Sequence, residues 1–170
     1  MKREEIIHSF KGIKIAVEVG VLRGRFASHM AKLDLDELHL IDPWKPFEDY
    51  PKKTKADWDR NYEFVQKKFI MNPKVTLHRT DSVTGAKQFP DEHFDLVYID
   101  ASHKYDSVKV DIETWLPKVK SGGIIGGHDI DTKGVLKAVG EVFTKWIETT
   151  EYDENTKGLK MAKSWFVTKQ

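Results

Sequence analysis

The sequence predicts an α/β protein in which a mostly parallel sheet is covered by helices on both faces, a doubly wound arrangement. Short apolar runs that suit buried strands alternate with longer segments that carry apolar residues at helical spacing. Parallel strands that are buried on both faces appear in a sequence as continuous apolar runs rather than as an alternating pattern. The predicted strands are residues 13–19, 37–41, 74–78, 94–99 and 123–126.

Four segments between and after these strands carry apolar residues three or four positions apart, which predicts helices with one buried face. We interpret the stripes as core-facing and assign them no chemistry. They are Phe26, Met30 and Leu33; Trp58, Tyr62, Val65 and Phe69; Val108, Ile112, Trp115, Leu116 and Val119; and Leu136, Val139, Phe143 and Ile147.

Two further segments have no such stripe. Residues 148–152 and 164–168 predict an antiparallel hairpin that completes the sheet, and the polar stretch 43–59 predicts a surface loop. This loop contains Trp44, Phe47 and Tyr50. These aromatic residues either form a lid that excludes water from a site or simply pack the loop against the domain.

Length and composition predict one domain over residues 1–170 and exclude several classes of function. The 28 Lys and Arg residues against 27 Asp and Glu give a net charge of +1, which argues against a nucleic-acid partner. The absence of Cys excludes a disulfide framework, a thiolate nucleophile and a Cys-ligated zinc site. Neither a membrane-spanning stretch nor a signal peptide is recognisable, so we expect a cytoplasmic protein without a membrane partner.

The first candidate site is the turn after the first predicted strand, which reads Glu-Val-Gly-Val-Leu-Arg-Gly over residues 18–24. Its two glycines fall short of the Gly-x-Gly-x-x-Gly pattern for a dinucleotide pyrophosphate, which disfavours a nicotinamide-dependent dehydrogenase. The spacing suits a nucleoside ligand, with Gly20 allowing close backbone approach and Gly24 allowing a helix to pack. A purely conformational role for both glycines stays open. Asp42, about twenty positions further on, would accept the ribose hydroxyls or form a turn before Pro43.

Ionisable residues also follow two later strands. Asp100 and His103 come after residues 94–99, and His128 and Asp129 come after residues 123–126. Ligands of open α/β sheets bind outside the carboxyl ends of the strands, so we expect these side chains to converge. Asp100, His128 and Asp129 offer oxygen and nitrogen donors that suit a divalent cation. The alternative is that His128 and Asp129 cap a helix expected near Gly134.

Together these motifs resemble those of class I S-adenosylmethionine-dependent methyltransferases. The chain is most similar to a small family whose fourth strand ends in Ile-Asp-x-x-His-x-Tyr and whose fifth reads Gly-Gly-x-Ile-x-Gly-His-Asp, a match from about Lys14 to Val139. The resemblance implies a seven-stranded, Rossmann-like sheet with an antiparallel last strand and S-adenosylmethionine as cofactor. It places Asp42 on the ribose, Trp44 against the adenine, and Asp81 and Ser82 at the adenine edge. The implied cofactor-binding residues are Glu18, Gly20, Val21, Gly24, Asp42, Trp44, Asp81, Ser82 and Asp100.

Catechol-type O-methyltransferases, which this family resembles, carry an Asp, a Lys base three residues later, and an Asp-Asn pair at these strand ends. The corresponding residues here are Asp100, His103 and the pair His128 and Asp129. The resemblance therefore implies His103 and Asp100 as catalytic residues and a metal at Asp100, His128 and Asp129. The pair His128 and Asp129, in place of Asp-Asn, shifts the expected metal from Mg toward Mn, Fe or Zn.

The expected function is methyl transfer to a hydroxyl of a small acceptor, such as a sugar or a phenolic metabolite. The alternatives are a metal-independent enzyme that uses His103 or His128 as base, with Asp100 on the cofactor's amino group, and a non-catalytic scaffold of the same fold. Phe26 replaces a small polar residue that often contacts the methionine carboxylate in the family. Arg23 either takes over this contact or is a solvated surface residue. The chain is short for such an enzyme, and a homo-oligomer is one way to supply the missing wall of the acceptor site.

Overall fold

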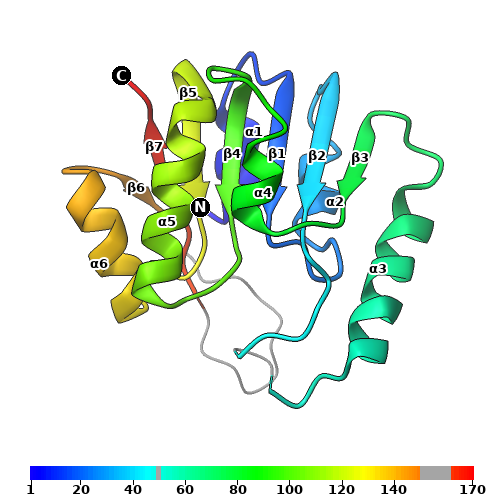
Figure 1. Cartoon of the computed structure of the whole chain (residues 1–170). Helices are drawn as coiled ribbons and strands as arrows, with labels where there is room; N and C mark the ends of the chain where they lie inside the picture. The colour runs from blue at the N-terminus through cyan, green and yellow to red at the C-terminus, as the bar shows by residue number, and fades with distance from the viewer. Residues whose placement is uncertain (49–50, 150–161) are drawn as a thin grey trace.

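A computed structural model of the protein contains a seven-stranded sheet with helices on both faces (Figure 1). The structure describes residues 1–48, 51–149 and 162–170. The strand order is β3-β2-β1-β4-β5-β7-β6; β1 to β5 pair in parallel, and β7 is antiparallel to both of its neighbours. The predicted doubly wound sheet with an antiparallel last strand is thereby confirmed. The strands are β1 (Ile15–Val19), β2 (Glu37–Ile41), β3 (Val75–His78), β4 (Phe94–Ile99), β5 (Val119–Gly127), β6 (Ile147–Glu148) and β7 (Trp165–Thr168).

The helices form a layer on each face of the sheet because side chains of successive strand residues point to opposite faces. On β1, for example, Ala16 contributes to one hydrophobic core and Val17 to the other. The first core is covered by α1 (Arg3–Ser9), α2 (Ala27–Met30) and α3 (Lys55–Phe69). The second is covered by α4 (Ser82–Ala86), α5 (Tyr105–Trp115) and α6 (Lys133–Val142), and the short helix η1 (Leu116–Lys118) joins α5 to β5.

Three of the four predicted helical stripes run past the real ends of their helices. In the first stripe, Leu33 lies beyond α2, which ends at Met30. Val119, counted on the third stripe, is the first residue of β5, because Pro117 ends α5 in a 3₁₀ turn. In the fourth stripe, Leu136 is 46% exposed and Ile147, which belongs to β6, is 52% exposed. The buried residues of α6 are instead Val135, Ala138 and Val139.

The loop and hairpin predictions are confirmed in part. The predicted loop 43–59 ends early, because Thr54 caps α3 by accepting a hydrogen bond from the Asp57 backbone N–H. β6 and β7 pair antiparallel as predicted. The first strand of the predicted hairpin, residues 148–152, is shorter than predicted, because β6 ends at Glu148 and Thr149 is not part of it; residues 150–152 lie outside the described residues. Among the helices described, none combines the length and the apolar character that spanning a bilayer requires.

The parallel strands end at one edge of the sheet, where their arrowheads lie together in Figure 1. The segments that follow β1, β2, β4 and β5 therefore meet at this carboxyl edge. All of the motifs that the sequence singled out for ligand binding lie there.

Candidate functional site

A cavity of about 820 Å³ opens at the carboxyl edge of the sheet. Its volume lies within the range of small-molecule sites, roughly 300–1,000 Å³. The turn after β1, the ends of β2 and β4, and the segment after β5 all contribute to the wall. Most of the predicted site residues line it: Glu18, Gly20, Val21, Asp42, Asp81, Ser82, Asp100, His103, His128 and Asp129.

Gly20 allows the turn after β1 to pack directly on the end of β4. It has a φ of +89°, and a Cβ there would lie 2.1 Å from the Asp100 carbonyl oxygen. The Gly20 backbone N–H donates to the Ile41 carbonyl, and the Asp100 N–H donates to the Val19 carbonyl. The close approach that this glycine permits is therefore between segments of the chain itself. Gly24 lies outside the cavity wall and allows packing against Phe69 of α3.

Asp42 is held by backbone groups of the two turns around it. Its Oδ2 accepts hydrogen bonds from the backbone N–H groups of Val21 and Leu22, and its Oδ1 accepts one from Trp44. Burial raises the pKa of Asp42, while these backbone donors oppose the rise. A carboxylate offers about four acceptor positions, so three donors leave room for one ribose hydroxyl rather than two. The geometry thus favours the turn-forming interpretation of Asp42.

Trp44 is part of the hydrophobic core. Its side chain is 0% exposed, its ring packs against Tyr62, and its Nε1 donates to the Leu22 carbonyl. A ring enclosed in this way does not reach a ligand in the cavity, which corrects the expectation that Trp44 lies against an adenine. Phe47 does line the cavity, together with Trp58, a residue that its helical spacing had assigned to the core alone. Tyr50, the third aromatic residue of the expected lid, lies outside the described residues.

Glu18 is a buried carboxylate in the cavity wall. Its side chain is 2% exposed, and its Oε2 has no hydrogen-bond partner in the described part of the chain. Burial raises the pKa of Glu18 well above its usual range; Asp100 adds to the rise and Arg3 opposes it. A buried polar atom without a partner costs free energy, so this oxygen is a natural place for a donor or cation supplied by a ligand.

Arg3 supplies a buried positive charge that the sequence had not indicated. Its guanidinium lies 4.5 Å from the ring centre of Phe26, and its Nη1 donates to the Tyr98 hydroxyl at 3.2 Å and to Asp100 Oδ2 at 3.4 Å. Arg3 belongs to α1, and no local pattern marks this residue as reaching the cavity. Arg23, the expected partner of a ligand carboxylate, also lines the cavity and lies over the Phe64 ring.

Asp81 and Ser82 line the cavity and at the same time begin α4. Asp81 caps this helix by accepting the Thr84 backbone N–H at 2.9 Å, which lowers the pKa of its carboxyl group. The Ser82 hydroxyl accepts a hydrogen bond from the Trp115 indole N–H. Both side chains therefore have a structural role in addition to any contact with a ligand.

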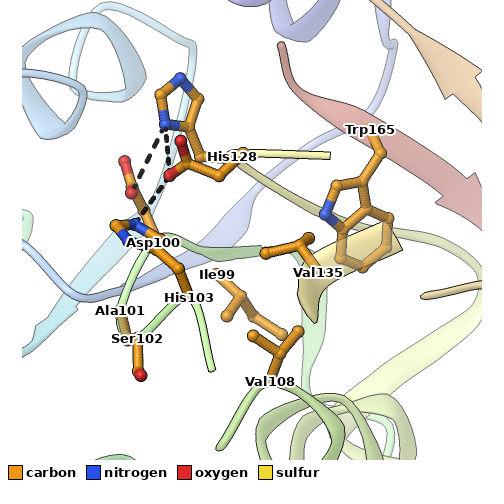
Figure 2. A pocket seen from close by; sticks show the side chains of 10 residues that line it. Ile99, Asp100, Ala101, Ser102, His103, Val108, His128, Val135 and Trp165 are labelled. Carbon is orange, nitrogen blue, oxygen red and sulfur yellow. Dashed lines mark hydrogen bonds and ion pairs between the residues drawn. The ribbon is translucent and has the colours of Figure 1, made fainter. Parts of the chain in front are cut away.

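Two histidines and two carboxylates gather beyond β4 and β5, as Figure 2 shows. Asp129 Oδ2 lies 2.8 Å from His103 Nε2 and 3.1 Å from His128 Nδ1, and His128 Nδ1 lies 3.7 Å from Asp100 Oδ1. Burial alone would raise the pKa of Asp129, but hydrogen bonds to the two histidines outweigh it and hold this pKa well below its usual range. We call these four residues the carboxyl-edge cluster.

The carboxyl-edge cluster contains one group that could hold a metal ion. Asp100, His103 and Asp129 each offer a ligand atom, and these atoms lie within 4.8 Å of one another. The sequence had predicted Asp100, His128 and Asp129 as metal ligands; the group with closely spaced ligand atoms in the structure contains His103 instead of His128. The capping alternative for His128 and Asp129 does not hold, because the N-cap of α6 is Thr132. A Cβ on Gly134 would lie 2.4 Å from the His103 carbonyl oxygen, so this glycine lets α6 approach the loop that carries His103.

The chain matches the family described as "Methyltransferase domain" over residues 17–130. This range is more than half of the chain and runs from β1 through the carboxyl-edge cluster. The protein therefore belongs to this methyltransferase family, which confirms the class that the sequence motifs indicated. Curated protein sequences give no significant match.

Solved structures share the fold at low sequence identity. Precorrin 8W decarboxylase from Methanobacterium thermoautotrophicum is 15% identical with a TM-score of 0.67, over 97% of this chain and 88% of that chain. N-methyltransferase NodS from Bradyrhizobium japonicum WM9 is 15% identical with a TM-score of 0.62, over 93% and 86%. Spermidine synthase from Thermotoga maritima is 12% identical with a TM-score of 0.65; the match covers 94% of this chain and 54% of that one. The protein thus spans about half the length of that synthase.

Proposed function

We propose that the protein binds S-adenosylmethionine and transfers its methyl group to a hydroxyl of a small molecule, such as a sugar or a phenolic metabolite. The observation that carries the proposal is the buried Glu18 carboxylate, whose Oε2 has no hydrogen-bond partner among the described residues and lies in the wall of the cavity. S-adenosylmethionine carries an ammonium and a sulfonium group, and either one would supply the missing positive charge. A relative of the same fold, NodS, has been solved in complex with S-adenosyl-L-homocysteine.

The rest of the cofactor would be held by residues around the turn after β1. The Arg3 guanidinium suits the methionine carboxylate, because arginine pairs with carboxylates through parallel hydrogen bonds. Asp42 would take one ribose hydroxyl through its remaining acceptor position. Asp81 and Ser82 would contact the adenine edge.

His103 would act as the general base. Its Nε2 lies 2.8 Å from Asp129 Oδ2, so the Asp129 carboxylate orients the ring and accepts the Nε2 proton. The His103 Nδ1 then carries the lone pair, and an imidazole titrates near neutral pH. In the proposed step the acceptor oxygen attacks the methyl carbon, and the bond from sulfur to this carbon breaks. The hydroxyl proton moves to His103 Nδ1, and the neutral thioether S-adenosylhomocysteine leaves.

We further propose a divalent cation held by Asp100, His128 and Asp129. Two carboxylates and an imidazole suit Mn, Fe or Zn better than Mg. When bound, the cation would supply Lewis-acid assistance to the loss of the acceptor proton. His103 is the competing ligand, since its ring nitrogen already meets Asp100 and Asp129 within 4.8 Å. A metal-independent reaction is the second candidate, and the short contact between His103 and Asp129 favours it.

The test of the cofactor site is a calorimetric titration of S-adenosylmethionine into chelator-treated protein, in two buffers with different ionisation enthalpies. Because burial raises the Glu18 pKa in the ligand-free protein, binding of a cationic ligand should lower this pKa and release protons at pH values between the ligand-bound and ligand-free pKa. Glu18→Gln should abolish this proton release and weaken binding by about tenfold or more. The matched control is Glu113→Gln on the exposed face of α5, which should change neither quantity. Absence of binding, or binding that Glu18→Gln leaves intact, contradicts the proposal and favours a scaffold.

The test of the chemistry measures S-adenosylhomocysteine release with a panel of sugars and phenols. His103→Ala should cut turnover about 10²-fold or more while leaving cofactor affinity nearly unchanged. Equal loss of both would contradict the assignment of His103 as base. Turnover that survives exhaustive chelation would select the metal-independent reaction, and turnover restored by added Mn²⁺ or Zn²⁺ would select the metal-assisted one.

A further inference from the structure

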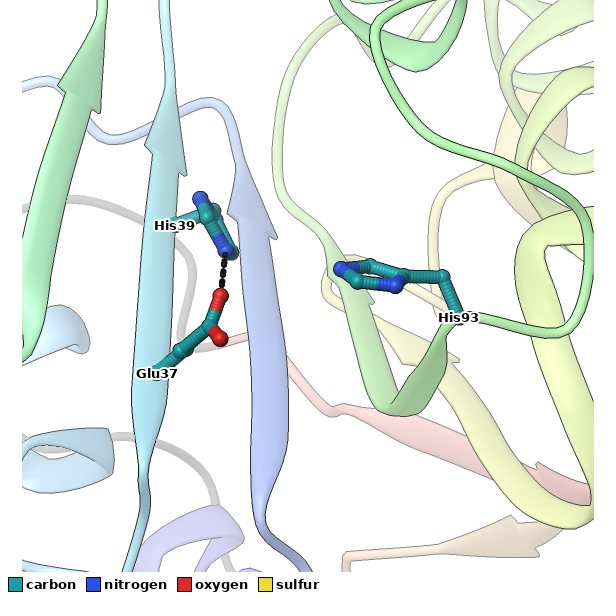
Figure 3. Close-up of side chains that lie close together, drawn as sticks. All are labelled: Glu37, His39 and His93. Carbon is teal, nitrogen blue, oxygen red and sulfur yellow. Dashed lines mark hydrogen bonds and ion pairs between the residues drawn. The ribbon is translucent and has the colours of Figure 1, made fainter.

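The start of β2 carries a second group of histidines and a carboxylate. Glu37 and His39 lie two residues apart on this strand, so their side chains share one face of the sheet. His93 belongs to the turn before β4, and its ring points toward them across β1 (Figure 3). One ligand atom from each of the three residues lies within 4.8 Å of the others. The strand from Glu37 to Asp42 spans about 16 Å, so this group is separate from the cavity.

We propose that Glu37, His39 and His93 bind a divalent transition metal ion of the zinc class. Two imidazoles and one carboxylate are a ligand set that zinc takes in proteins, with a fourth position left for water. The two nitrogen donors favour zinc and its neighbours over magnesium and calcium, which prefer oxygen donors. This metal site does not depend on the proposed methyl transfer.

The distances fit a tetrahedral site with a small adjustment. His39 Nε2 lies 3.0 Å from Glu37 Oε2. Ligand atoms bound at about 2.0–2.1 Å in a tetrahedron lie about 3.3 Å apart, so this pair already has the spacing of two ligands. His93 would move inward by at most about 1.5 Å to the same spacing. It lies in a turn and is half-buried, so a ring rotation can supply this movement.

A chain of hydrogen bonds behind His39 can present its Nε2 as a ligand. His78 Nδ1 faces Gln88 Oε1 at 3.1 Å, and His39 Nδ1 faces His78 Nε2 at 3.0 Å. If the Gln88 oxygen accepts the His78 Nδ1 proton, then His78 Nε2 accepts the His39 Nδ1 proton. This leaves a lone pair on His39 Nε2, directed at the Glu37 carboxylate. A metal ion bound between His39 Nε2 and the Glu37 carboxylate would satisfy both groups. Histidines that bind a metal through one ring nitrogen regularly donate a hydrogen bond through the other, as His39 would to His78.

Aromatic rings enclose the inner side of this group. His39 is 8% exposed; the Phe89 ring stacks on His93 with centroids 5.4 Å apart and meets His39 edge-on at 4.9 Å. Glu37, in contrast, is exposed and leaves the site open to water on one side. An apolar wall on one side and an open side on the other suit a metal that keeps one water ligand. Bound metal would tie the turn before β4 to the start of β2.

The test is a titration of Zn²⁺ into tag-free, chelator-stripped protein, followed by calorimetry. The carboxyl-edge cluster is a second candidate site, so the titration is made in the Asp129→Asn variant. This variant should bind one zinc ion per chain, and the additional change His93→Ala should weaken binding at least 100-fold, because one of three ligands is lost. The control is His8→Ala, an exposed histidine of α1, which should leave the affinity unchanged. Titration with Co²⁺ should give the visible spectrum of a tetrahedral nitrogen and oxygen site.

Two results would overturn the proposal: zinc binding that His93→Ala leaves unchanged, or no zinc binding by the Asp129→Asn protein. If Asp129→Asn fails to fold, the wild type and His93→Ala are compared directly. The stoichiometry should then fall by one ion per chain. Equal stoichiometry and affinity in these two proteins would show that a proton, and not a metal, lies between His39 and Glu37.

Discussion

The ends of β1 and β2 each place a buried carboxylate in the wall of the same cavity. The two carboxylates differ in the hydrogen bonds that they accept from the rest of the protein. Asp42, after β2, accepts three backbone N–H groups. Glu18, on β1, has one oxygen without a hydrogen-bond partner within the described residues. Burial raises the pKa of both groups; three backbone hydrogen bonds oppose the rise at Asp42, whereas the charge of Arg3 and one backbone hydrogen bond, from Ala27, oppose it at Glu18. The difference shows that the contacts of Asp42 hold the two turns together, whereas one oxygen of Glu18 is left for the ligand that we propose.

Asp42→Ala gives the largest expected effect. Three backbone donors of the turns after β1 and β2 would lose their acceptor, and unsatisfied buried groups cost about 1–3 kcal/mol each. Because water can reach part of the emptied space, we expect a loss of about 3–5 kcal/mol in the free energy of unfolding. Urea denaturation measures it. A variant as stable as the wild type would show that Asp42 is not a structural residue and would return it to a ligand-binding role.

Asp111 extends the comparison to a third buried carboxylate, for which the hydrogen bond that opposes the pKa rise comes from a side chain, Ser82. Asp111 lies on α5, and burial raises its pKa to about 6. A raised pKa means that stability is fully present below the unfolded-state pKa and is lost as the pH rises toward 6. Asp111→Asn should therefore stabilise the protein by up to about 3 kcal/mol at pH values above 6 and have little effect near pH 4. Urea denaturation as a function of pH checks the difference, and a stability gain that is equal at both pH values would contradict this account.

Glu18→Gln should also stabilise the empty protein, in contrast to Asp42→Ala. The raised pKa of Glu18 means that its ionised form is disfavoured in the fold, so the gain should appear as the pH rises and vanish in acid. Thermal denaturation without ligand measures this effect. A loss of stability at neutral pH would show that the Glu18 carboxylate is compensated in the folded protein after all.

Trp44→Phe gives the smallest expected effect. It tests whether Trp44, in the turn after β2, is a core residue or contacts the cofactor. The change removes the hydrogen bond from the indole to the Leu22 carbonyl and should cost about 1 kcal/mol of stability. Affinity for S-adenosylmethionine should change by less than about threefold, since stacking between aromatic rings is worth about 0.5–1.5 kcal/mol and no such contact is lost. Calorimetry measures the affinity. A tenfold loss of affinity for S-adenosylmethionine would indicate that Trp44 contacts the adenine after all.

The sheet was largely predictable because each buried parallel strand is a short apolar run bounded by polar residues. Residues 37–41 and 94–99 were predicted with the observed bounds. The predicted helical stripes fail mostly at the helix ends: α5 stops before Pro117, and the stripe of α6 continued past its last residue, Val142. Within α6, Val139 is buried as predicted and Leu136 is not. Apolar spacing alone does not show where a helix stops.

The sequence predicts which residues meet at the site when their positions follow from the order of the strands. It does not predict contacts that depend on how distant segments pack together. Parallel strands end at one edge, so the convergence of Asp100, His103, His128 and Asp129 follows from the strand pattern. The contacts of Asp42, the burial of Trp44 and the reach of Arg3 depend on how distant segments fold onto each other. No spacing in the sequence carries that information.

The position of β7 has a consequence for the order in which the molecule can fold. This strand lies between β5 and β6, so within the described residues the pairing partner of β6 is made only when residues 165–168 have been synthesised. Trp165 of β7 also borders the pocket beside His103 and Asp129. During translation, therefore, the carboxyl edge would be completed only after β7 has been made, and until then the unpaired edge of β5 is where the nascent chain would be most open to mispairing.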